Sequence, residues 1–68
     1  MAENPIKTFF DQGGDLGSEA GIQLLSNTDQ GIIKVAVIGS KDIGLALLKL
    51  REKIDDETLR KKILFALA

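Results

Sequence analysis

Residues 32–54 read IIKVAVIGSKDIGLALLKLREKI, and this stretch decides the fold of the 68-residue chain. After Ser40, apolar residues recur at spacings of four, three and four, which is the pattern of a helical seam. The seam consists of Ile43, Leu47, Leu50 and Ile54. Further apolar residues stand at positions 45, 46 and 48, so the predicted helix must be buried on several sides.

The preceding segment, Ile32–Ile38, fits two structures. It is rich in β-branched residues and bounded by Gly31 and Gly39, as a buried strand would be. As a helix, it would continue without a break into a helix that runs to Ile54. A strand needs a partner, and only Ile6–Phe10 offers one, in a sheet of unusually small size. We therefore favour a helix and keep, as the alternative, a small α/β fold with Ile32–Ile38 as a strand.

Small residues recur at every fourth position through the same stretch. If the region is helical, Ala36, Ser40 and Gly44 lie on one face of the helix. Such a ladder of small residues lets two helices approach each other closely. These residues predict either a site of close helix packing or, as the alternative, a bend in the chain.

The chain begins with a short predicted helix. Asn4 is a favoured N-cap, and Pro5 suits the first helical position. Apolar residues follow at the spacing of one helix face, and Gly13-Gly14 ends the helix. These apolar residues are Ile6, Phe9 and Phe10.

A second helix is predicted to begin at Ser18, with Asp15 as an alternative cap. The polar residues 26–29 end it, because their side chains compete for backbone hydrogen bonds. Thr28 or Asp29 then caps the next element.

The last predicted helix is capped by Asp55 or Asp56. Asp56 with Arg60, and Glu57 with Lys61, are spaced as acid-first ion pairs on a helix, each worth about 0.2–0.5 kcal/mol. Its predicted buried face consists of Leu59, Ile63, Ala66 and Leu67.

The chain is too small to bury a large core alone. It allows one domain, residues 1–68, and a domain of this size buries only about 60% of the surface that the unfolded chain exposes. Cysteine and histidine are both absent, so neither disulfides nor the usual zinc sites can add stability. The expected fold is therefore a mostly α, compact domain of three to four helices that forms an oligomer.

The same absences exclude the standard nucleophile–base pairs of enzymes. The acidic residues 55–57 are explained by capping and by the helix dipole. A single small domain also offers little room for a shaped pocket. We therefore expect a non-enzymatic protein with no cofactor and no metal.

No targeting or membrane-spanning segment is expected. The first ten residues lack the basic start and apolar run of a signal peptide. The most apolar region, residues 32–50, includes Lys34, Lys41, Asp42 and Lys49. Each charge at the centre of a bilayer costs about 2.5–3.5 kcal/mol. The expected location is the cytoplasm.

The glycines at 39 and 44 suggest an alternative function. The stretch from Lys34 through Gly39 and Gly44 resembles the opening of a dinucleotide-binding Rossmann unit, which implies a strand, a phosphate-binding turn and a helix. Lys41 occupies the middle glycine position of that fingerprint, where the phosphates need room. A phosphate- or nucleotide-binding loop at Gly39–Gly44 is thus one alternative.

The predicted C-terminal hairpin suggests another. Its basic residues are Lys49, Arg51, Lys53, Arg60, Lys61 and Lys62. Acidic residues are interleaved with them, and the isoelectric point is about 5.2, whereas nucleic-acid-binding domains usually show a clustered basic excess. A small DNA-binding regulator is therefore an alternative, and a solvated surface is the favoured interpretation.

Together these features favour a protein-interaction or assembly module. Its apolar helix faces would bind a second copy of the chain, or another protein. The predicted interface or core seam consists of Ile43, Leu47, Leu50, Ile54, Leu59, Ile63 and Leu67. The sequence pattern does not divide these residues between core and interface.

Overall fold

The computed structural model describes residues 3–68, and this part of the chain contains five helices and no strand. They are α1 (Pro5–Asp11), α2 (Glu19–Asn27), α3 (Gln30–Gly39), α4 (Lys41–Arg51) and α5 (Glu57–Leu67). The prediction of a mostly helical fold is confirmed, although three to four helices were expected. The alternative strand at Ile32–Ile38 is wrong, because α3 contains that whole segment and the only candidate partner strand lies in α1.

The prediction of one continuous helix to Ile54 is also wrong, because the helix is interrupted at Ser40. The backbone of Ser40 is extended, with φ −154° and ψ 118°. Its N–H donates to the Val37 carbonyl, and its Oγ accepts the N–H of Ile43 at 3.4 Å. Gly39 and Ser40 are both weak helix formers, and Ser is a favoured cap. One residue therefore ends α3 and begins α4, which lets the two helices pack against each other.

Each helix begins with a side-chain cap. The predicted caps Asn4 and Ser18 are confirmed. Asp15 does not cap α2, since its carboxylate accepts the N–H of Gly17 at 2.8 Å within the loop. Asp29, and not Thr28, caps α3, and Asp56, the second of the two adjacent aspartates, caps α5. Each such cap contributes about 1 kcal/mol, so local sequence sets most helix starts.

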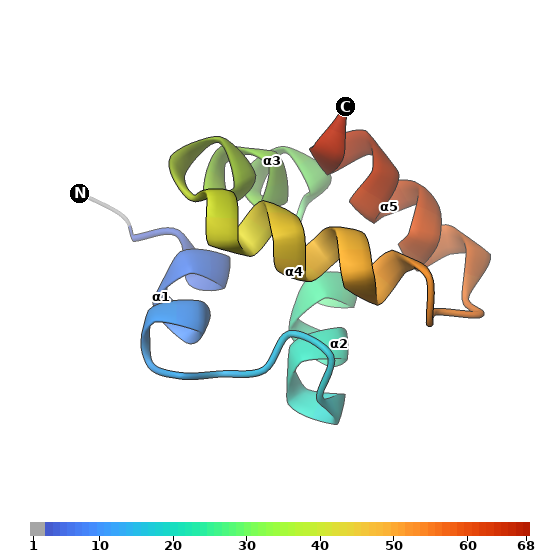
Figure 1. Cartoon of the computed structure of the whole chain (residues 1–68), viewed down its shortest axis with the longest axis horizontal. Helices are drawn as coiled ribbons and strands as arrows, with labels where there is room; N and C mark the ends of the chain where they lie inside the picture. The colour runs from blue at the N-terminus through green and yellow to red at the C-terminus, as the bar shows by residue number, and fades with distance from the viewer. Residues whose placement is uncertain (1–2) are drawn as a thin grey trace.

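Helix α3 is the centre of the packing. It contacts α1, α4 and α5, while α4 also contacts α5 and α1 contacts α2. Figure 1 shows α4 crossing in front of α3, with α5 beside both. The molecule measures 33 × 23 × 21 Å. Its core consists of Ile6, Leu16, Leu25, Ile33, Ala36, Ile43, Leu47, Leu50, Ile54, Leu59, Ile63 and Ala66.

A lysine of α5 holds the end of α2. The Nζ of Lys62 donates to the Leu25 carbonyl at 3.2 Å and to the Ser26 carbonyl at 2.7 Å. Carbonyls in the last turn of a helix have no partner within the helix, and they carry its negative dipole end. Lys62 therefore joins two helices that are far apart in the sequence.

The two ion pairs predicted on α5 are not formed. Within residues 3–68 the only ion pair joins Lys7 and Asp11, at 2.8 Å. The carboxylate of Asp56 instead accepts the N–H of Leu59 at 3.2 Å. Water screens the attraction between exposed charges, so the pairs Asp56–Arg60 and Glu57–Lys61 would add little stability even at a favourable spacing. None of the described helices is long and apolar enough to cross a membrane.

Candidate functional site

The residues of the predicted seam lie inside the protein. Six of them are buried in one core, and the seventh, Leu67, is partly buried and packs against that core. The six are Ile43, Leu47, Leu50, Ile54, Leu59 and Ile63. The structure therefore places these side chains in or against the core rather than on the surface.

The three predicted close-packing residues are not on one helix. Ala36 is buried in α3, Ser40 connects α3 to α4, and Gly44 lies in α4. A Cβ on Gly44 would lie 3.5 Å from Cγ1 of Val37, which is ordinary van der Waals distance. Gly44 therefore faces α3 without requiring unusually close helix contact.

The structure around Gly39–Gly44 differs from a Rossmann opening. Gly39 is the last residue of α3, and Lys41 is the first residue of α4. A helix thus stands where the resemblance implies a strand. Among residues 3–68 no group of three acidic side chains gathers to hold a metal ion.

The basic residues of the α4–α5 hairpin do not form one surface. Lys49 and Lys53 line a groove beside α2, whereas Arg51, Arg60 and Lys61 line a separate hollow. The sixth, Lys62, is engaged with the end of α2. The phosphate backbone of a nucleic acid would therefore not contact all six basic side chains on one surface.

The outward face of α3 is an exposed apolar surface. The exposed fractions are 40% for Ile32, 62% for Val35 and 76% for Ile38. These residues are spaced by three along the helix, opposite the buried Ile33 and Ala36. A helix that packs on a core with one side needs large apolar residues on that side only, so those on the opposite side are not explained by core packing. We call Ile32, Val35 and Ile38 the α3 face.

The only charged side chain of α3 is directed to its own chain. The Nζ of Lys34 lies 5.2 Å from the ring centroid of Phe65, the geometry of a cation–π contact. Phe65 is itself 47% exposed. The contact therefore brings a further exposed aromatic ring beside α3 and leaves the α3 face uncharged.

The sequence pattern does not single out the α3 face, but it contains a usable signal. Six of the seven residues from 32 to 38 are apolar. Once the segment is assigned to a helix, such a run must place apolar side chains on opposite sides. Which side contacts the core depends on the packing of α1, α4 and α5 around it.

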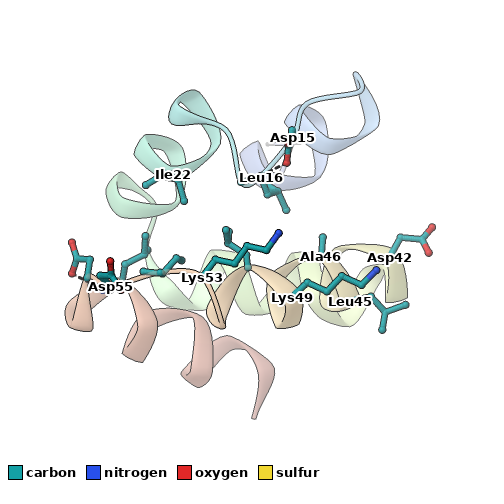
Figure 2. A pocket seen from close by; sticks show the side chains of 14 residues that line it. Asp15, Leu16, Ile22, Asp42, Leu45, Ala46, Lys49, Lys53 and Asp55 are labelled. Carbon is teal, nitrogen blue, oxygen red and sulfur yellow. Dashed lines mark hydrogen bonds between the residues drawn. The ribbon is translucent and has the colours of Figure 1, made fainter.

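A second surface is a groove of about 850 Å³ along α4. Figure 2 shows α4 on one side, with Ile22 of α2 and Leu16 of the α1–α2 loop across from it. Leu45, 57% exposed, and the half-buried Ala46 add apolar area from α4. The groove is therefore apolar along its base and open to solvent.

Charged side chains border this groove in a regular order. Figure 2 shows Asp42 and Asp55 at its opposite ends, with Lys49 and Lys53 between them. None of these four charges belongs to an ion pair within the described chain. From Asp42 in α4 to Asp55 beyond its end, the order on this side of the groove is thus negative, positive, positive, negative. Asp15 on the opposite side and Asp56 add two further carboxylates to the lining.

Comparison with protein-family models, curated proteins and solved structures finds no match for this chain.

Proposed function

We propose that the protein is a non-enzymatic assembly module whose α3 face pairs with the same face of a second copy. The exposure of Ile32, Val35 and Ile38 on one helix carries the proposal. Burial of apolar surface contributes roughly 25 cal/mol for each Å² removed from water. Pairing of two α3 faces would bury these three side chains from both copies.

The absence of charge on the α3 face favours a second copy as the partner. A two-fold interface sets each residue against its own counterpart or a close neighbour, so a charged face repels itself. The α3 face carries no charge, and Lys34 is held over Phe65. Like can therefore pack on like without an electrostatic cost.

The spacing of the face suggests how two copies would meet. If two α3 helices pack antiparallel, Val35 lies on the two-fold axis and Ile32 meets Ile38 of the second copy. At one end of the stripe, apart from Gly39's own helix backbone and chain neighbours, no atom lies within 4 Å of the Cβ position of Gly39, so a neighbour can approach closely.

Helix α3 alone is too small for a stable interface. A standard interface takes about 800 Å² from each partner. That is about a sixth of the 4628 Å² surface described here. Further exposed side chains would have to join, and Phe65, which contacts Lys34 of α3, is one candidate.

Opposite charges at the axis test this proposal. Sedimentation equilibrium should give a dimer for the wild type, and monomers for Val35→Glu and Val35→Lys, because each variant places two like charges at the axis. An equimolar mixture of the two variants should form dimers again, since the charges then attract. Circular dichroism would show that both variants keep their helices.

Leu45→Glu is the matched control, because Leu45 is similarly exposed but lies on α4. It should leave the mass of the dimer unchanged. A wild type that stays monomeric at millimolar concentration would contradict the proposal. A dimer that survives both Val35 variants would contradict it too, since the interface would then lie elsewhere.

A further inference from the structure

We infer that the groove along α4 binds an amphipathic helix of a partner protein, whose acidic edge lies against Lys49 and Lys53. This site is separate from the α3 face and is not needed for self-association. Its base, its charges and its length each restrict the occupant.

The base of the groove is apolar but not fully covered. Leu16 and Leu50 are buried beneath it, at 2% and 8% exposure. Leu45 is 57% exposed, and Ile22 and Ala46 are half-buried along the same groove. An apolar helix face laid between α2 and α4 would therefore bury these last three side chains further.

The lysines provide the charge that a partner must match. Lys49 lies in α4 and Lys53 in the turn after it, and both side chains line the same groove (Figure 2). Both are exposed, and neither forms an ion pair within residues 3–68. Two acidic residues on one side of a partner helix would meet both ammonium groups.

The carboxylates that line the groove determine which charges the two ends of the partner helix should carry. Asp15 and Asp56 already accept backbone N–H groups, of Gly17 at 2.8 Å and of Leu59 at 3.2 Å. Asp42 and Asp55 are at the two ends of the groove and have no ion-pair partner in the described chain. Basic residues at both ends of the partner would complement them.

The charge order argues against a second copy lying groove to groove. Two-fold pairing would set the lysine pair against itself and each end carboxylate against another. The complementary order is positive, negative, negative, positive, which the groove of a second copy does not supply. The α4 part of the groove, residues 42–51, is about 15 Å long at 1.5 Å per residue, and residues 52–55 extend the groove beyond the helix, so the matching partner helix has at least about 10 residues.

A displayed peptide library tests the inferred chemistry directly. The library consists of helical peptides of about 16 residues, with leucine fixed on one face and the flanking positions varied among Glu, Lys and Ala. The bait is the full-length chain. We expect selected peptides to carry Glu at two central positions four apart and Lys near both ends. With the bait Lys49→Glu/Lys53→Glu, the central preference should change to Lys.

Binding of one selected peptide then measures the effect. Fluorescence anisotropy should show affinity at least tenfold weaker for Lys49→Glu/Lys53→Glu. Arg60→Glu/Lys61→Glu changes the net charge equally but lies outside the groove, so it should bind as the wild type does. Because the groove contains no residue of the α3 face, Val35→Glu should also bind normally, whatever the outcome for self-association.

Three results would overturn the inference. One is the absence of any enriched peptide, and another is the same charge preference on the wild-type and lysine-reversed baits. The third is growth of open filaments by the chain alone that stops with Lys49→Glu/Lys53→Glu. That outcome would assign the groove to another part of a second copy.

Discussion

Gly21 has no side chain, and this lets the backbone of the loop before α2 pack directly against the helix. It is buried, and a Cβ there would lie 2.6 Å from Cα of Leu16. The obstructing atoms belong to the backbone, so they cannot rotate away. We expect Gly21→Ala to lower the free energy of unfolding by about 1–3 kcal/mol, although alanine favours helices, because overpacking exceeds that gain. Urea denaturation at fixed protein concentration measures this.

Gly44→Ala is the matched comparison for Gly21→Ala. Gly44 lies inside α4, and its Cβ would meet Val37 at an ordinary 3.5 Å. The free energy of unfolding should rise by about 0.5–1 kcal/mol, the helix-propensity difference between the two residues. A destabilised Gly44→Ala protein would show that α3 and α4 are packed more closely than the structure indicates.

At the scale of elements, Lys62 links α2 to α5. Lys62→Met keeps the aliphatic part of the side chain but loses the hydrogen bonds to the carbonyls of Leu25 and Ser26. We expect the free energy of unfolding to fall by about 1–2 kcal/mol, because the end of α2 loses a positively charged donor. Thermal or urea unfolding followed by circular dichroism would measure the change.

Lys61→Met is the control for this link, since Lys61 is exposed on the same helix. It should change stability by less than about 0.5 kcal/mol. Equal effects of the two substitutions would show that the bonds from Lys62 to α2 add nothing to stability. Hydrogen exchange should also become faster in the last turn of α2 only for Lys62→Met.

At the scale of the whole molecule, self-association couples stability to concentration. If folded copies pair through α3, the thermal midpoint should rise by a few degrees for each tenfold increase in protein concentration, because binding stabilises the folded state by mass action. Scanning calorimetry over a concentration series measures this rise.

Val35→Glu should remove that dependence without removing the transition. Its side chain is 62% exposed in the isolated chain, so the monomer should still fold cooperatively. A midpoint that is independent of concentration in the wild type would contradict pairing of folded copies. Loss of the cooperative transition in the variant would instead show that the monomer needs its partner to fold.

Helix positions follow from nearby residues to a large extent. Asn4 and Ser18 cap α1 and α2 as predicted, because a cap forms with an N–H only two or three residues away. The break at Ser40 has a local cause as well, yet the apolar pattern on both sides of it predicts a continuous helix. Periodicity reports which residues are apolar, and it does not show where the helix axis turns.

The composition and local pattern of this chain are sufficient for its helical class, most of its helix starts and the apolar character of residues 32–54. Tertiary packing alone decides that Leu47 lies in the core while Val35 faces solvent, since both belong to equally apolar runs. It also decides that Lys49 and Lys53 border a groove while Lys62 ties two helices together. The physical reason is that the burial of a side chain depends on which elements from distant parts of the chain pack over it. The local sequence pattern does not contain that information.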